Sequence, residues 1–158
     1  MPCYNSKNKT FDTYIPDSCN ELAFRMCLSI TQGRCRCRCH PLLIYGASGC
    51  GKTHLLLAIK SGSEKAVGYF LAEDLAKNAG AEAAEAYSRY DVILIDSLDE
   101  LCGNQDAQDR LFALIKKLDS AGIQVVLATN RFIDGFDVFK NRLLTECGDA
   151  MICDIRGV

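Results

Sequence analysis

The stretch Gly46-Ala47-Ser48-Gly49-Cys50-Gly51-Lys52-Thr53 decides the fold of this chain of 158 residues. It matches G-x-x-x-x-G-K-[ST] at every fixed position, a pattern that binds phosphate groups. An apolar run at 42–45 precedes it and a helical segment begins at Lys52, so we expect a buried strand, a loop and a helix. The glycines let successive amides turn inward, and the helix N-terminus adds its positive dipole end. All eight residues are therefore predicted to bind a nucleotide.

Two side chains of this loop and two residues outside it are predicted to act on the bound phosphates. Lys52 can reach the β- and γ-phosphates, and the hydroxyl of Thr53 can ligate Mg²⁺. Asp96 ends a buried apolar run and is the second predicted Mg²⁺ ligand, through water; a helix-capping aspartate is the alternative. Asn130 follows another apolar run and is predicted to orient the attacking water or contact the γ-phosphate; a turn-forming asparagine is the alternative. Lys52, Asp96 and Asn130 are thus the candidate catalytic residues.

Strand and helix signals alternate along the chain. The predicted strands are 42–45, 67–71, 92–95, 125–128 and 151–153. The predicted helices are 19–31, 52–60, 72–87 with a break near Gly80, one that Asn104 caps and Gly122 ends, and 137–146. A capping box of Ser18 and Glu21 is expected to start the first helix. Because this alternation is typical of βαβ units, we predict a three-layer α/β fold in which helices flank a five-stranded parallel sheet.

The composition is that of an ordinary globular protein. Lys and Arg number 18 against 20 Asp and Glu, a net charge of −2 that excludes a general polyanion-binding protein. Apolar residues make up 49% and charged residues 24%, which excludes a disordered or fibrous chain. No apolar run approaches the ~20 residues of a membrane helix, and the first residues lack the apolar core of a signal peptide. We therefore expect one soluble, cytoplasmic domain with no membrane partner.

Ten cysteines are the unusual feature of the composition. Without an export signal, the expectation is reduced thiols that pack as small apolar groups. This interpretation suffices for the cysteines inside or beside apolar segments, which are Cys27, Cys50, Cys102, Cys147 and Cys153. In a second group, Cys35, Cys37 and Cys39 alternate with arginines, and His40 follows directly. Either these residues bind Zn²⁺, for which their spacing is poor, or they belong to a surface loop with a basic face.

Together these elements resemble the AAA+ ATPase core of the bacterial replication initiator DnaA and its relatives, over residues 10–155. The segment 10–15 with Asn20 is similar to the segment that cradles adenine in this family, and the loop continues as GKTHL, as in the family. The resemblance implies ATP or ADP with Mg²⁺ as ligands. It also implies that Tyr14, Ile15, Asn20 and His54 bind the nucleotide along with the loop.

The second half of the chain carries the same resemblance. Residues 94–96 are similar to the family's Mg²⁺-binding strand, and residues 124–131 to its sensor strand. Residues 141–143 resemble the start of a helix in a conserved box, here called the box helix, and residues 151–155 resemble the final strand. The implied organisation is an N-terminal tail at 1–9 and a single AAA+-like nucleotide-binding domain at 10–158.

Two positions depart from the family's pattern. The family has a second acidic residue directly after the metal-binding aspartate, but here that position is Ser97, which cannot act as a carboxylate base. Asp99 and Glu100 lie near it in sequence. The family's arginine finger falls four residues after the arginine of the box helix, which is Arg142, and here that position is Glu146. Loss of such a finger can lower the rate of hydrolysis ~10³–10⁵-fold.

These observations predict an ATP-binding, slowly hydrolysing module that acts in DNA replication initiation or its regulation. It would act through nucleotide-dependent contacts with a replication initiator or a replicative helicase, or with a second copy of itself. The family's helical lid and its helix-turn-helix domain have no match here, so we expect no sequence-specific binding of duplex DNA. The alternatives are a catalytically inactive ATP-binding module, a helicase loader or a transposon helper. A small-molecule kinase would need a basic lid segment, which the sequence after the fourth strand does not provide.

Overall fold

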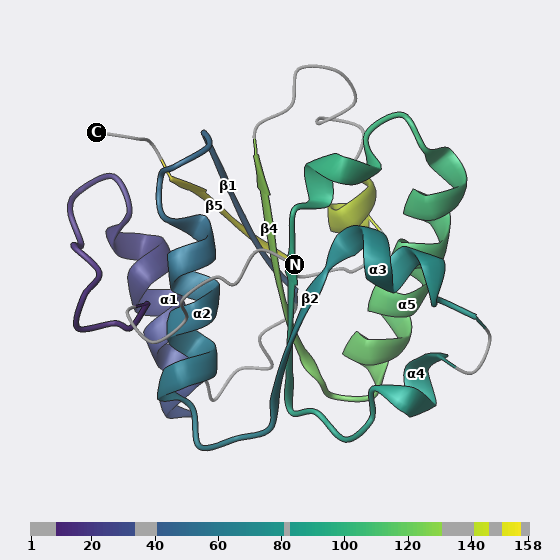
Figure 1. Cartoon of the computed structure of the whole chain (residues 1–158), viewed down its shortest axis with the longest axis horizontal. Helices are drawn as coiled ribbons and strands as arrows, with labels where there is room; N and C mark the ends of the chain where they lie inside the picture. Colours follow the sequence, from purple (N-terminus) through teal and green to yellow (C-terminus); the bar gives the residue numbers. More distant parts are fainter. Residues whose placement is uncertain (1–8, 34–40, 81–82, 131–140, 146–149, 156–158) are drawn as a thin grey trace.

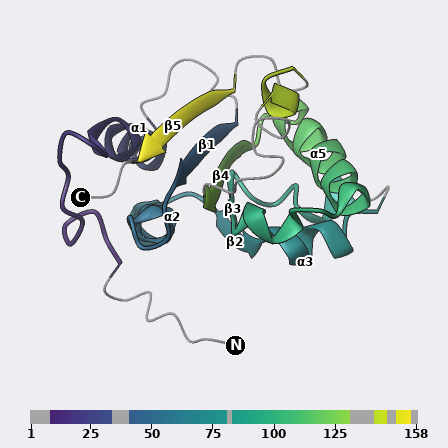
Figure 2. The ribbon, with the colours of Figure 1, turned by 90° about the horizontal axis from the view of Figure 1, so that it is seen from above.

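The computed structural model describes residues 9–33, 41–80, 83–130, 141–145 and 150–155 of the chain. Within these residues, five strands form one parallel sheet in the order β2-β3-β4-β1-β5 (Figure 2). The predicted fold, an α/β fold with a five-stranded parallel sheet, is confirmed. The strands are β1 (Leu42–Gly46), β2 (Val67–Leu71), β3 (Val92–Asp96), β4 (Gln124–Asn130) and β5 (Met151–Ile155).

Helices cover both faces of the sheet and give the molecule three layers (Figure 1). On one face lie α1 (Glu21–Gln32) and α2 (Lys52–Gly62); on the other lie α3 (Ala72–Lys77), α4 (Ala83–Ala86) and α5 (Gln105–Ser120). Successive side chains of a strand point to opposite faces, so each strand serves two cores. In β3, Val92 and Leu94 pack on the side of α1 and α2, whereas Ile93 and Ile95 pack on the side of α5.

The capping box predicted for the first helix is wrong. α1 begins at Glu21, and its N-cap residue, Asn20, makes no side-chain capping hydrogen bond. Asn20 Oδ1 instead accepts a hydrogen bond from the Asp17 amide at 2.7 Å, and Asp17 Oδ1 accepts one from the Cys19 amide at 2.7 Å. These side chains therefore stabilise the turn before the helix, a local use of side-chain oxygens that competes with capping.

Other helix predictions are confirmed in part. Asn104 caps α5 as predicted, because its Oδ1 accepts a hydrogen bond from the Ala107 amide at 3.1 Å. The expected break near Gly80 separates α3 from α4. The 3₁₀ helix η2 (Leu98–Leu101) was not predicted. Of the predicted helix 137–146, residues 141–145 are helical and the rest lies outside the described residues.

Among the described residues, no helix is long and apolar enough to cross a membrane.

The cysteines differ in how far they are buried. Cys27 and Cys153 are buried in the core on the side of α1 and α2, as expected, and burial raises the pKa of both thiols. Cys102 is exposed just after η2, so the prediction that its thiol packs as a small apolar group is wrong. Cys147 and the group of Cys35, Cys37, Cys39 and His40 lie outside the described residues.

Gly46 lies where β1 passes into the phosphate loop, between two neighbouring strands. It is in register with Asn130 of β4 and Ile155 of β5. A Cβ atom on Gly46 would collide with the backbone carbonyl of Ile155 and would lie 2.8 Å from Cys50 Sγ. The absence of a side chain therefore lets the end of β5 approach the start of the loop.

We predict that Gly46→Ala lowers the free energy of unfolding by ~2 kcal/mol, because backbone atoms of β5 must move to admit the added methyl group. Gly80→Ala is the matched control, since its Cβ would meet no atom within 4 Å. Urea unfolding followed by circular dichroism measures both changes. Equal stability of the two variants would contradict the close approach of β5 to Gly46.

Candidate functional site

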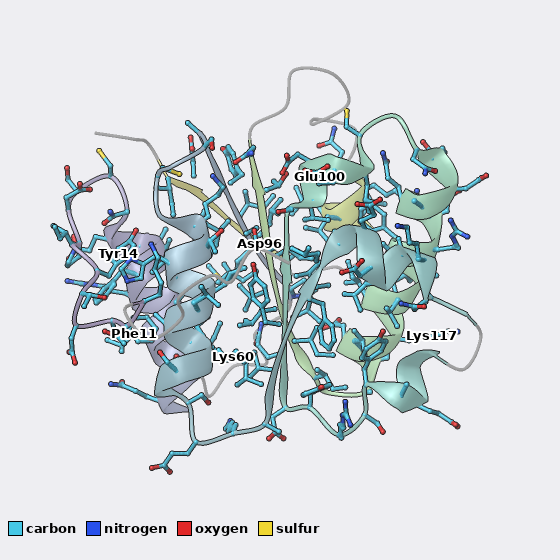
Figure 3. The ribbon with its side chains drawn as sticks, in the orientation of Figure 1. Phe11, Tyr14, Lys60, Asp96, Glu100 and Lys117 are labelled. Carbon is cyan, nitrogen blue, oxygen red and sulfur yellow. The ribbon has the colours of Figure 1, made fainter. Side chains whose placement is uncertain are left out.

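A pocket of about 430 Å³ lies at the carboxyl ends of β1, β3 and β4. In open parallel sheets this is the edge at which ligands bind. Figure 3 shows Asp96 beside the central strands, between α2 and η2. The described residues that line the pocket are polar or glycine, and they are Lys9, Ser48, Gly49, Gly51, Lys52, Thr53, His54, Asp96, Ser97, Asp99 and Asn130.

The phosphate loop joins β1 to α2, as the sequence predicts. Gly49 and Gly51 have φ angles of 82° and 98°, which residues that carry a side chain rarely adopt. Gly51 also faces the Tyr14 ring, and a Cβ there would lie 3.0 Å from that ring. Of the eight loop residues, Gly46, Ala47 and Cys50 are outside the pocket lining, and the other five are part of it.

Lys52 is 7% exposed and directs its ammonium group into the loop. Its Nζ donates hydrogen bonds to the carbonyl oxygens of Gly46 at 2.9 Å and Ala47 at 2.7 Å. The Cys50 Sγ atom lies 3.5 Å from the same Nζ. A buried charge needs such partners, because an unpaired ammonium would be costly away from water. The positive charge is therefore fixed beside the pocket by the loop's own backbone.

Thr53 and Asp96, predicted to hold Mg²⁺ together, are in contact. The Thr53 hydroxyl donates to Asp96 Oδ2 at 2.8 Å, and the Tyr69 hydroxyl donates to the same oxygen at 2.6 Å. A hydroxyl and a carboxylate at the edge of a phosphate loop fit Mg²⁺, a cation that takes few protein ligands and completes its shell with phosphate oxygens and water. No group of three or more His, Cys, Asp or Glu side chains suited to a metal occurs among the described residues. Tyr69 is a contact of the site that the sequence analysis missed.

Two further residues that the sequence analysis left out of the site, Ser97 and Asp99, line the pocket. Ser97 has a φ angle of 61°, the one described residue other than glycine in this region, and its amide donates to Asp96 Oδ1 at 2.8 Å. The chain then turns through η2, so Asp99 faces β4. Asp99 Oδ1 accepts a hydrogen bond from the Asn130 amide at 3.1 Å, and Oδ2 accepts one from Asn130 Nδ2 at 3.4 Å. Asp96 ends β3 and Asp99 lies in η2, so no single repeat relates the two residues and the sequence carried no periodic signal for Asp99.

The three residues expected to cradle adenine do not line this pocket. Tyr14 is 7% exposed, and its ring stacks on Phe24 at 5.6 Å between centroids. Ile15 is 82% exposed. Asn20 Nδ2 donates to the Ile15 carbonyl at 3.3 Å and so helps to shape the turn between Ile15 and α1. Figure 3 shows Tyr14 beside α1, on the far side of α2 from Asp96.

His54 connects this N-terminal segment to the pocket. Its Nε2 lies 2.8 Å from the Thr10 carbonyl oxygen and 3.1 Å from Thr13 Oγ1, and its ring meets Tyr14 edge to face. Lys9, the first residue of this segment, also lines the pocket and was not a predicted site residue. The segment at 9–15 thus lies against α2 at the edge of the pocket.

A family model described as the bacterial DnaA ATPase domain matches residues 5–154. The chain belongs to this family. The chromosomal replication initiator protein DnaA of Chlorobaculum tepidum is 29% identical over 160 residues, which cover 93% of this chain and 32% of that protein. The chain therefore spans about a third of the length of this DnaA protein.

Solved structures agree with the DnaA assignment. The structure of AMPPCP-bound DnaA from Aquifex aeolicus has a TM-score of 0.78 and 25% identity, and the match covers 96% of this chain and 50% of that one. The structure of the DnaC helicase loader has a TM-score of 0.66 and 18% identity, and the match covers 96% of this chain and 99% of that one. At that identity, the likeness to the helicase loader shows a shared fold.

The arginine of the box helix lies against α5. Arg142 forms an ion pair with Asp109, and its guanidinium lies 4.6 Å from the centre of the Phe112 ring. The hydrogen bond from Arg142 lowers the pKa of the Asp109 carboxyl, and a second one from Gln105 adds to this effect. Glu146, which the sequence analysis predicts at the position of the DnaA arginine finger, lies outside the described residues.

We predict that Tyr14→Phe raises the free energy of unfolding by about 1 kcal/mol at pH 7, because the buried Tyr14 hydroxyl has no hydrogen-bond partner among the described residues. Tyr69→Phe is the matched control: it removes a hydroxyl that donates to Asp96, and so should lower the free energy of unfolding. Chemical unfolding of the three proteins measures these differences.

Alkaline pH should widen the gap between Tyr14→Phe and the parent protein. Burial, with smaller effects from Cys27, Cys50 and Asp17, raises the pKa of Tyr14 from 10.0 to about 12. Below pH 10 the residue is protonated in both states; between pH 10 and 12 it ionises only in the unfolded state. The parent should then lose up to about 1.4 kcal/mol per pH unit relative to the variant. A constant difference across this range would contradict the burial of the Tyr14 hydroxyl.

Proposed function

We propose that this chain is an ATP-binding and slowly hydrolysing module of the DnaA type, which acts in replication initiation or its regulation through nucleotide-dependent protein contacts. One observation carries the proposal. Lys52, the Thr53–Asp96 pair and Asn130 all meet in a single pocket, although they come from three separate elements. The AMPPCP bound to the Aquifex aeolicus relative supports a nucleotide as the ligand.

Phosphate binding follows from the groups around the loop. The Lys52 ammonium now donates to two backbone carbonyls, and phosphate oxygens are stronger acceptors because they carry negative charge. We expect Lys52 to turn from these carbonyls toward the β- and γ-phosphates. Thr53 and Asp96 would hold Mg²⁺, which supplies positive charge to the phosphates when bound. Asn130 faces the same space and would contact the γ-phosphate or its attacking water.

Slow hydrolysis is proposed from the two departures from the DnaA pattern. Ser97 lines the pocket where DnaA proteins carry an acidic residue, and a hydroxyl cannot hold the proton of an attacking water at neutral pH. Glu146 takes the place of the arginine finger, so a neighbouring copy would not supply positive charge to the transition state from this position. Slow hydrolysis would let the ATP-bound state persist. Such a state is suited to presenting a surface to a partner protein rather than to rapid turnover of ATP.

The partners are proposed from the comparisons. A DnaA relative is named as a chromosomal replication initiator, and a protein of the same fold is named as a helicase loader. We therefore propose an initiator or a replicative helicase as the partner, with self-association as a further nucleotide-dependent contact. The pull-down of each candidate with and without ATP distinguishes these contacts.

We predict that Lys52→Ala abolishes ATP binding, because no other described cation lies inside the loop. Lys60→Ala is the matched control, since Lys60 is exposed near the other end of α2 (Figure 3). Titration calorimetry measures affinity, and thermal unfolding with ATP provides a second measure. ATP at one hundred times its dissociation constant should stabilise the parent and Lys60→Ala by about 2.7 kcal/mol and leave Lys52→Ala unchanged. Equal ATP affinity of Lys52→Ala and Lys60→Ala would contradict the proposed site.

A further inference from the structure

Asp99 is an acidic group of the pocket that the proposed binding of ATP does not use. Asp96 and Asp99 are the two carboxylates among the described lining residues, and Asp96 is already bonded to Thr53 and Tyr69. Asp99 is partly buried and comes from a different element, η2. Its carboxylate therefore lies on the side of the pocket next to β4.

The position of Asp99 is fixed by its neighbours on η2. Leu98 and Leu101 are 2% and 3% exposed and belong to the core on the side of α5. They hold the short helix against the sheet, while Ser97 makes the turn that leads into it with a φ angle of 61°. A residue in this conformation is strained and persists where the surrounding structure requires it. The strain at Ser97 is thus the local cost of directing Asp99 toward β4.

The hydrogen bonds of Asp99 orient its carboxylate and leave it free to accept more. The Asn130 amide binds Oδ1 at 3.1 Å, and Asn130 Nδ2 binds Oδ2 at 3.4 Å. An ionised carboxylate has about four acceptor sites, so these two bonds leave lone pairs for a water molecule. Asn130 and Asp99 together form an orienting donor and an adjacent acceptor beside the proposed γ-phosphate position.

We propose that Asp99 is the general base for ATP hydrolysis and takes over the part of the acidic residue that is missing at Ser97. This assignment rests on the proposed function as an ATPase, and it leaves the missing arginine finger as the main cause of the slow hydrolysis proposed there. It differs from the DnaA pattern, in which the acid directly follows the metal-binding aspartate.

The proposed step transfers one proton and one phosphoryl group. A water molecule held by Asp99 and Asn130 attacks the γ-phosphorus, and a new phosphorus–oxygen bond forms as the bond to the β,γ-bridging oxygen breaks. The electron pair of the broken bond stays with ADP, and the proton of the water passes to the Asp99 carboxylate. Inorganic phosphate leaves, and Asp99 then gives its proton to solvent.

The test compares Asp99→Asn with Glu100→Gln in the full chain. Glu100 is exposed on the same 3₁₀ helix and is absent from the pocket lining, so its change removes the same charge one residue away (Figure 3). We expect Asp99→Asn to lower phosphate release ~10²–10⁴-fold, the usual contribution of a general base, while Glu100→Gln keeps the parent rate. Calorimetric affinity for Mg²⁺ and ATP should stay within about twofold of the parent in both variants, because a base acts on water rather than on the bound nucleotide.

A second variant separates a base from a residue that only positions Asn130. Adding Ser97→Asp to Asp99→Asn places a carboxylate where DnaA proteins have one, and aspartate tolerates the positive φ angle of this position. We expect the double variant to regain at least tenfold of the lost rate. No regain would indicate that Asp99 acts through Asn130, and would overturn its assignment as the base.

The remaining outcomes are also distinguishable. An unchanged rate in Asp99→Asn overturns the assignment, as does a loss of ATP affinity that matches the loss of rate. ATP binding by the parent without phosphate release overturns the assignment and leaves the proposed binding function standing. Failure of the parent to bind ATP overturns the proposed function itself.

Discussion

The hydrogen bonds of the Lys52 ammonium to the carbonyls of Gly46 and Ala47 are the interaction on which the site depends. A cation that is 7% exposed must be compensated, and here the backbone of its own loop supplies the compensation. These bonds tie the end of β1 to the start of α2 across the phosphate loop. They also keep a positive charge beside the pocket, where a negatively charged acceptor such as a phosphate oxygen can bind to the ammonium group.

The sheet brings other polar groups to the pocket that Lys52 lines. β3 ends at Asp96 and β4 ends at Asn130, and parallel strands place these ends on one edge. The Thr53–Asp96 hydrogen bond then joins α2 to β3, while the Asp99–Asn130 bonds join η2 to β4. Under the proposed function, binding and hydrolysis would draw on two adjoining networks. The first would hold the phosphates and Mg²⁺, and the second would hold the water that attacks the γ-phosphate.

Much of the fold could be predicted because its signals are local. The limits of β2 at Val67–Leu71 follow from one apolar run, and Asn104 was identified as a cap from its place before the apolar stripe of α5. Long-range features escaped prediction. The η2 turn depends on a strained conformation at Ser97 and on burial of Leu98, neither of which a linear pattern reports. The sequence likewise could not show that Tyr14 turns inward against Phe24 while its neighbour Ile15 is exposed.

The central claim is that nucleotide phosphates replace the carbonyls of Gly46 and Ala47 as hydrogen-bond acceptors for Lys52. A crystal structure with AMPPCP and Mg²⁺ tests this claim most directly. The nucleotide should occupy the pocket between the phosphate loop, Asp96 and Asn130. The Lys52 Nζ atom should lie within hydrogen-bond distance of the β- or γ-phosphate and have left the carbonyls of Gly46 and Ala47. A nucleotide bound elsewhere, or Lys52 still donating to both carbonyls with the nucleotide in place, would contradict it.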